Sequence, residues 1–239
     1  MKRLRRPRFL FVYPLAAALF LAARTSERRL LWGIVIIMLG EAVRLWANGY
    51  VGNKKVNWTP QARHDQKIGR LITAGPYSHV RHPLYFGTFL IGAGFCLIVG
   101  NLWLSLLALG GFLVIYRRKM AEEEETLAHE WGEEFERYRR TVSRWLPGWR
   151  TAPERHGRWT WQGLQASKEP KTLAWLIILL ILLYFREELI QNHERLWGTP
   201  KHALLVAVLV LLLLGDGLYE LWHRRRKRRM AAQPTSSAG

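Results

Sequence analysis

The sequence predicts an all-α integral membrane protein with about six membrane helices, two of which form a short hairpin. Apolar residues are gathered into blocks although the chain as a whole, at 23% charged residues and a mean hydropathy of -0.07, resembles a soluble protein. Several blocks are shorter than the roughly 20 residues that cross a bilayer vertically, but aromatic ends extend them into the interface. The blocks are Phe9–Ala23, Leu30–Trp46, Leu84–Val99, Leu102–Tyr116, Thr172–Phe185 and His202–Trp222.

The distribution of basic residues accounts for the net charge of +18. Of the 36 Lys and Arg residues, 29 fall in segments 1–8, 48–83, 117–171 and 223–239, whereas loops 24–29 and 186–201 hold three each. An excess of Lys and Arg in alternate loops is the positive-inside pattern of membrane proteins. It predicts a multi-pass protein in the lipid bilayer, with both termini and the active site facing the cytoplasm. Nucleic acid is not an expected partner, because topology explains the charge and no known binding module is present.

The first helix is expected from Phe9 to Ala23, and residues 1–23 resemble a signal peptide with a poor cleavage site. We therefore favour an uncleaved membrane helix. The second helix, from Leu30 to about Ala47, carries Glu41 and Arg44 at i and i+3. These charges form either an ion pair along the helix or a contribution to the interior of a site.

The hairpin, Leu84–Val99 and Leu102–Tyr116, has only Gly100-Asn101 between its arms. An amphipathic cytoplasmic helix is expected to follow from residue 117, with apolar residues at helical spacing, an interruption at Gly132 and an end at Pro147-Gly148. The predicted domains are a membrane core over 1–150, an interfacial linker over 151–171 and a two-helix extension with a basic tail over 172–239. The lone Cys96 permits neither an intramolecular disulfide nor a thiolate metal site, and no metal is predicted.

Residues 73–87 concentrate groups that bind anions and rings at the edge of this hairpin. Pro83 suits the first turn of the following helix, and the backbone N–H groups of residues 84–86 are expected to donate to an anion. Arg81 and His82 lie beside that helix start and suit a carboxylate. Tyr77 and Tyr85 offer ring faces to a purine or a sulfonium. Gly87 permits the close approach of a ligand or a helix.

The four consecutive glutamates at 122–125 return to the same membrane face after the hairpin. Glu123 and Glu124 are then suited to an ammonium group or to ribose hydroxyls. Taken singly, each feature has a simpler explanation, because Arg-His-Pro is often an interfacial anchor and a glutamate run is often a solvated face. Their convergence predicts a site for a zwitterionic, adenine-bearing cofactor at the lipid boundary.

The same residues resemble a known family. The segment Gly75-Pro76-Tyr77-(x3)-Arg81-His82-Pro83-x-Tyr85-x-Gly87, followed by Glu123-Glu124-x-x-Leu127, is similar to the signature of the isoprenylcysteine carboxyl methyltransferases. The resemblance covers about residues 40–150, and phospholipid N-methyltransferases share the motif. It implies a pocket for S-adenosylmethionine, lined by Tyr77, His79, Val80, Arg81, His82, Pro83, Tyr85, Gly87, Glu123 and Glu124. Among these, the resemblance favours catalytic roles for Arg81, His82, Tyr85 and Glu123.

The predicted function is methyl transfer from S-adenosylmethionine to a lipophilic acceptor, and carboxyl O-methylation of a prenylcysteine-like or isoprenoid substrate is favoured. One alternative is N-methylation of a phospholipid or another amine. A second is an NADPH-dependent membrane reductase, and a third is a non-catalytic membrane adaptor with a basic cytoplasmic face. The sequence leaves the acceptor and the oligomeric state open.

Overall fold

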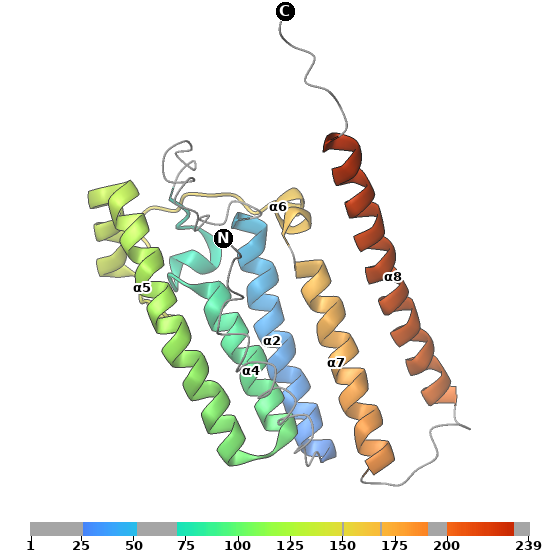
Figure 1. Ribbon diagram of the computed structural model, residues 1–239. Helices are drawn as coiled ribbons and strands as arrows, with labels where there is room; N and C mark the ends of the chain where they lie inside the picture. Colours follow the sequence, from blue (N-terminus) through green and yellow to red (C-terminus); the bar gives the residue numbers. More distant parts are fainter. Residues whose placement is uncertain (1–25, 52–70, 150, 168, 191–199, 232–239) are drawn as a thin grey trace, which may run out of the picture. The chain divides into compact units, whose positions relative to one another are not determined.

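The computed structural model describes residues 26–51, 71–149, 151–167, 169–190 and 200–231, and within them every regular element is a helix (Figure 1). The all-α prediction is confirmed for this part of the chain. The predicted first helix, Phe9–Ala23, lies outside the described residues. The elements are α2 (Glu27–Val51), the 3₁₀ turn η1 (Gly75–Ser78), α4 (Pro83–Val99), α5 (Leu102–Thr141), α6 (Trp161–Ala166), α7 (Glu169–Ile190) and α8 (Pro200–Ala231).

Two described helices are long and apolar enough to cross a membrane, namely α2 and the Pro200–Leu218 part of α8. The α4 helix is apolar but shorter. Together with the relatives reported below, these helices indicate a membrane protein. The predicted number of six membrane helices and the orientation of the termini stay predictions.

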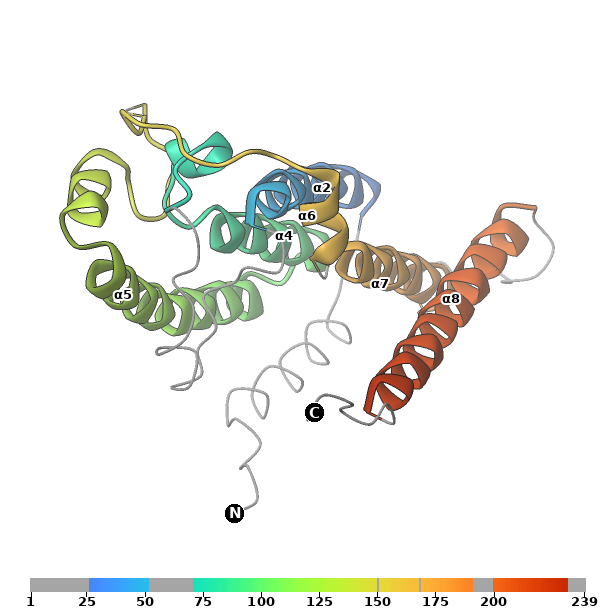
Figure 2. The same cartoon turned by 90° about the horizontal axis from the view of Figure 1, so that it is seen from above.

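Helix α4 lies between α2 and α5, as both views show (Figures 1 and 2). Its contact with α2 depends on glycine. A Cβ atom added to Gly40 would lie 2.6 Å from the carbonyl oxygen of Gly87, and one added to Gly94 would lie 2.6 Å from that of Gly33. Because real Cβ atoms do not approach backbone so closely, only glycine allows the two backbones to meet here. Gly87 therefore serves the approach of a helix.

The predicted hairpin is present, and its turn has the expected chemistry. Gly100 ends α4 in the left-handed conformation, with φ of 66°, and Asn101 caps α5 by accepting a hydrogen bond of 3.1 Å from the N–H of Leu104. The second arm does not end at Tyr116, because α5 continues without a turn into the charged stretch. The predicted charged helix is thus the continuation of the hairpin.

The helical backbone of α5 is interrupted at Gly132, where φ is 49° and ψ is -122°, as predicted. It ends at Thr141, earlier than the predicted end at Pro147-Gly148, because Val142 is extended and Ser143 forms an isolated bridge with Val80. The reversal at Gly132 brings Tyr138 back over the 3₁₀ turn, where its hydroxyl donates a 2.7 Å hydrogen bond to the carbonyl of Tyr77. A small core forms beneath it from Leu71, Phe135, Tyr138, Val142 and Ala152.

Residues 151–169 belong to the first unit of the chain, Met1–Glu169. The carbonyl of His156 accepts hydrogen bonds from the N–H groups of Thr73 and Ala74, at 3.0 and 3.1 Å. Further on, the N–H of Thr160 donates to the carbonyl of Gly49 at 2.9 Å. This stretch, predicted as an interfacial linker, therefore carries specific backbone bonds to the end of α2 and to residues 73–74.

The second unit, Pro170–Gly239, is built from α7 and α8. Lys171, at the start of α7, forms a 3.0 Å ion pair with Asp216 of α8. At the other end of α7, the hydroxyl of Tyr184 lies 3.3 Å from Nε2 of His202, at the start of α8. Because the start of one helix meets the later part of the other, the two helices are antiparallel.

Candidate functional site

The approach to α4 has a fixed conformation. Gly75 has a φ of 62°, and a Cβ there would lie 2.3 Å from the ring of Tyr50, so glycine is required for both backbone and packing reasons. Pro83 stands in the first turn of α4, as predicted. The N–H of Arg81 donates to the carbonyl of Ser143 at 2.9 Å. The loop after α5 thus fixes the segment that carries Arg81 and His82.

Glu124 is the centre of a buried polar cluster. Only 4% of its side chain is exposed. Its carboxylate accepts hydrogen bonds from Nε2 of His82 at 3.1 Å and from Nη2 and Nε of Arg144 at 2.5 and 3.1 Å. Nη1 of Arg81 lies 3.4 Å from the same carboxylate. The predicted meeting of Arg81 and His82 with the glutamate pair is confirmed by these distances.

Glu123 has a different environment from that of its neighbour. It accepts a short hydrogen bond from the hydroxyl of Tyr85, and its other oxygen lies 3.4 Å from Nδ1 of His82. Its side chain is 20% exposed. The flanking Glu122 and Glu125 are exposed. The middle two residues of the glutamate run therefore face inward, and only Glu123 keeps access to the surroundings.

The cluster shifts the pKa values of its members in opposite directions. Burial alone would raise the pKa of Glu124, but hydrogen bonds from His82 and Arg144 and the charge of Arg81 outweigh it and lower that pKa to about 2. Burial alone would lower the pKa of His82, yet its bonds to Glu123 and Glu124 raise it above its ordinary value. The site therefore holds an ionised glutamate and favours a protonated histidine.

The guanidinium of Arg81 is a buried cation. Its side chain is 10% exposed, and its Nε and Nη1 atoms have no hydrogen-bond partner among the described residues. The 3.4 Å approach of Nη1 to Glu124 is within ion-pair distance but does not have hydrogen-bond geometry. Burial lowers the pKa of the guanidinium, and the charge of Glu124 opposes that effect. Buried donors without partners are costly, so this group is suited to an anionic ligand.

Other predicted residues lie around the cluster without joining it. Val80 is buried and bridges to Ser143, while Tyr77 offers its carbonyl to Tyr138. The imidazole of His79 makes no hydrogen bond or ion pair with the described residues, although its carbonyl accepts from the N–H of Gly148 at 3.0 Å.

The predicted role of the backbone N–H groups at the start of α4 is wrong for two of the three. Those of Tyr85 and Phe86 donate to the carbonyl of His82, at 3.2 and 3.1 Å. They are therefore not free to bind an anion.

Sequence reasoning missed Arg144. It follows the end of α5 by three residues and reaches back to Glu124, twenty positions earlier. No spacing rule marks it, because its position depends on the reversal at Gly132 and on the extended backbone at Val142. The only signal in the sequence is a lone arginine just after a helix end.

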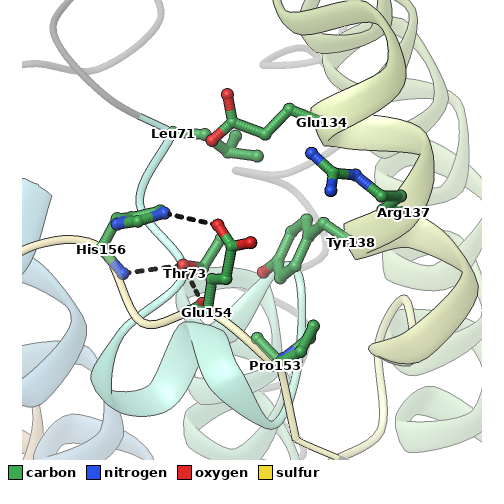
Figure 3. Close-up of a pocket in the computed structure, with 9 residues that line it drawn as sticks. Leu71, Thr73, Glu134, Arg137, Tyr138, Pro153, Glu154 and His156 are labelled. Carbon is green, nitrogen blue, oxygen red and sulfur yellow. Dashed lines mark hydrogen bonds and ion pairs between the residues drawn. The ribbon is translucent and has the colours of Figure 1, made fainter.

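A hollow is lined in part by Leu71, Tyr138 and Pro153 (Figure 3). Its volume is about 40 Å³. Glu154 and His156 stand on one side, joined by a 3.0 Å contact between Oε2 and Nε2, and Glu134 and Arg137 of α5 stand on the other (Figure 3). In the described residues, the cations Arg81 and His82 contact the glutamates directly.

A second buried polar cluster involves Arg44. Its guanidinium makes a two-pronged contact with Glu169, at 2.6 and 3.1 Å, and donates a short hydrogen bond to Thr88 of α4. Glu41 lies 3.7 Å away, and neither of its carboxylate oxygens has a hydrogen-bond partner among the described residues. The ion pair expected along α2 is therefore present, whereas a contribution of this pair to the interior of the site stays a prediction.

Part of the chain matches a known protein family. Residues 28–134 match the family model described as phospholipid methyltransferase. The match includes α2, α4 and most of α5, and therefore Arg81, His82, Glu123 and Glu124. Arg144 and residues 151–169 lie beyond it. No solved structure matches the chain significantly.

Individual proteins with similar sequences are named as methyltransferases. The chain is 26% identical over 121 residues to the protein-S-isoprenylcysteine O-methyltransferase of Dictyostelium discoideum, with 49% of this chain and 50% of that protein covered. It is 30% identical over 118 residues to the enzyme of the same name from Xenopus laevis, with 48% and 39% covered. Over about half of its length, this chain is therefore similar to proteins named protein-S-isoprenylcysteine O-methyltransferase, the family that the motif resembles. It matches half or less of the length of these curated relatives.

Proposed function

We propose that this protein transfers a methyl group from S-adenosylmethionine to a lipophilic acceptor at the cytoplasmic face of a membrane. The favoured acceptor is the carboxylate of a prenylcysteine-like or isoprenoid molecule. One observation carries the proposal, namely the buried guanidinium of Arg81 with two unpartnered donor atoms beside an inward-facing glutamate pair. The methyltransferase names of the relatives support the same chemistry.

The residues present fit the charges of the donor. Its carboxylate suits the free donor atoms of Arg81, and its ammonium group suits Glu123, which keeps an accessible face. The ring of Tyr85, fixed by its bond to Glu123, suits the sulfonium by a cation–π contact. When bound, S-adenosylmethionine supplies an electrophilic methyl group on a positively charged sulfur.

The neighbouring hollow is too small for the rest of the donor. At about 40 Å³ it lies well below the range of roughly 300–1,000 Å³ that small-molecule sites occupy. Tyr138 lines this hollow and donates a hydrogen bond to the carbonyl of Tyr77. We therefore assign no part of the donor to this hollow.

The protein's own contribution is positioning in a site that excludes water. Glu124, held by Arg144, keeps His82 and Arg81 in place. Alignment of an acceptor atom with a bound methyl group supplies much of the rate in such transfers. A carboxylate acceptor is already ionised at neutral pH and needs no general base. This agrees with a site whose most buried carboxylate is permanently charged.

Amine methylation is the second candidate, because the matching family model is described as phospholipid methyltransferase. An amine must lose a proton before or during transfer. Glu123 is the residue placed to accept it, since it is accessible and linked to Tyr85 and His82. Assayed at saturating S-adenosylmethionine, a Glu123→Gln variant separates the candidates, because it would abolish amine methylation but leave carboxylate methylation measurable.

The test is transfer of a labelled methyl group. The full chain in membranes is incubated with labelled S-adenosylmethionine and either a farnesylated cysteine derivative or phosphatidylethanolamine. We expect a base-labile methyl ester on the farnesylated compound, absent in an Arg81→Met variant. If S-adenosylhomocysteine fails to raise the melting temperature of the purified protein while NADPH does, the methyltransferase proposal is wrong and the reductase alternative is supported.

A further inference from the structure

A continuous row of aromatic side chains leads away from the polar cluster along the seam between α4 and α5. The rings of His82 and Tyr85 lie 5.7 Å apart between centroids, and those of Tyr85 and Tyr116 lie 4.9 Å apart. Tyr116 stacks on Phe112 at 4.1 Å. These distances are those of ring pairs in direct contact. The first half of the row thus links the head of α4 to the apolar half of α5.

The second half of the row crosses back to α4 and ends in the loop after α5. Phe112 and Phe89 lie 5.8 Å apart, and Trp145 meets Phe89 edge to face at 4.8 Å. Tyr85 and Phe89 are four residues apart on α4, and Phe112 and Tyr116 are four apart on α5. Because side chains at that spacing share one helix face, each helix presents a pair of rings to the same seam.

These rings are not part of a buried core. Tyr85, Phe89, Phe112, Tyr116 and Trp145 are all partly exposed, whereas the core rings Phe135 and Tyr138 are almost fully buried. Next to the row, α5 exposes large apolar side chains such as Leu113 and Trp103. The row therefore presents ring faces at an apolar surface and has one end at a charged cluster.

Trp145 adds a polar atom to the row. Its indole N–H is buried and has no hydrogen-bond partner among the described residues. Its neighbour in sequence, Arg144, is the residue that holds Glu124. The same short loop thus contributes to the polar cluster and to the far end of the row.

We infer that Phe89, Phe112 and Trp145 bind the hydrocarbon tail of the methyl acceptor and set its specificity. The inference rests on the proposed function and extends it to residues outside the motif. A molecule lying along the row has its head beside Tyr85 and Glu123 and its tail against ring faces at membrane depth. Such a surface favours a flat, unsaturated isoprenoid chain, because its double bonds and methyl groups contact ring faces closely.

The test compares acceptors across matched variants of the full chain. Cysteine derivatives that carry geranyl, farnesyl or saturated hexadecyl groups are assayed with wild type, Phe89→Leu, Phe112→Leu and Trp145→Phe. Trp103→Leu is the control, because Trp103 is 79% exposed on α5 and outside the row. We expect the row variants to raise the KM for the farnesyl compound about three- to tenfold and to leave the KM for S-adenosylmethionine unchanged. The control leaves both constants unchanged.

A photoreactive farnesylcysteine gives a readout that needs no turnover. We expect light-induced labelling of wild-type peptides that contain residues 85–89, 112–116 or 145, and competition by the unlabelled compound. Labelling confined to other peptides, or KM values for the acceptor that do not change in the row variants, overturns the inference. If S-adenosylhomocysteine binds in that case, the proposed function survives, whereas failure of donor binding by itself counts against the proposed function.

Discussion

Helix α4 has two unlike faces. The face toward α2 is built on glycines, so the two backbones touch at Gly40–Gly87 and Gly33–Gly94. The face toward α5 carries Tyr85 and Phe89, which are partly exposed and are joined to a row of other rings. The face toward α2 therefore fixes the position of the helix, and the face toward α5 is left available for a ligand. The charged cluster lies at the N-terminal end of this helix, beside the loop that follows α5.

The largest loss of stability is expected from a substitution on the face of α4 that packs against α2. In Gly94→Leu, the new side chain would meet the carbonyl of Gly33 at 2.6 Å and the side chain of Ile37 at 2.7 Å. We expect a loss of at least about 3 kcal/mol in the free energy of unfolding, measured by denaturation in detergent. Gly110→Ala is the matched control, since no atom lies within 4 Å of its added Cβ. Equal stability of the two variants would show that the α2–α4 contact is not as close as described.

The next effect concerns the centre of the polar cluster. Glu124→Ala leaves Arg81 and His82 buried without their shared carboxylate. We expect the free energy of unfolding to fall by about 3 kcal/mol, because the remaining charged groups stay buried without an opposite charge. Glu122→Ala, on the same helix but exposed, is the control and should change stability by less than about 0.5 kcal/mol. The measurement is thermal unfolding of both proteins in the same detergent.

Glu123 should separate stability from binding. Its accessible carboxylate makes fewer contacts than that of Glu124, so we expect Glu123→Ala to cost about 1 kcal/mol in stability. The same change should weaken binding of S-adenosylhomocysteine at least tenfold, because the ligand's ammonium group loses its partner. A variant that binds the ligand normally would remove Glu123 from the donor site.

Stability should also depend on pH through His82. Its pKa is raised in the folded protein, so its contribution is complete below the ordinary imidazole value near 6.5 and is lost as the pH rises through the raised value. Glu124 acts in the opposite range, and its contribution is lost only as the pH falls toward about 2. We expect the melting temperature to fall on going from pH 6 to pH 9 in the wild type and to fall less in His82→Ala.

The smallest effect is expected at His79. Its imidazole contacts no polar group among the described residues, so His79→Ala should change the free energy of unfolding by less than about 0.5 kcal/mol. A larger loss of stability, measured in the same unfolding assay, would reveal a structural contact of the ring.

The sequence predicted the parts of this site that depend on local rules. Pro83 in a first helical turn, Gly100 at a helix end and Gly132 as a break follow from backbone chemistry that each residue carries with it. The pairing of Arg81 and His82 with the glutamates followed from the hairpin, which returns the chain to one side.

What the sequence did not reveal depends on the tertiary path of the chain. Arg144 reaches Glu124 only because α5 reverses at Gly132 and ends before Ser143. The partnering of Arg44 by Glu169 joins residues 125 positions apart. Neither contact has a periodic or spacing signal. The hollow beside Tyr138 was not predicted either, since its walls come from segments that meet only in the folded protein.

Isothermal calorimetry of S-adenosylhomocysteine with the purified full chain tests the central claim most directly. We predict saturable binding with one site per chain in the wild type and its loss in Arg81→Met, where the buried cation with unpartnered donors is removed. Thermal unfolding of the variant serves as the check on folding. Undiminished binding by a folded Arg81→Met protein, or no binding by the wild type, would contradict the assignment of this cluster as the methyl-donor site.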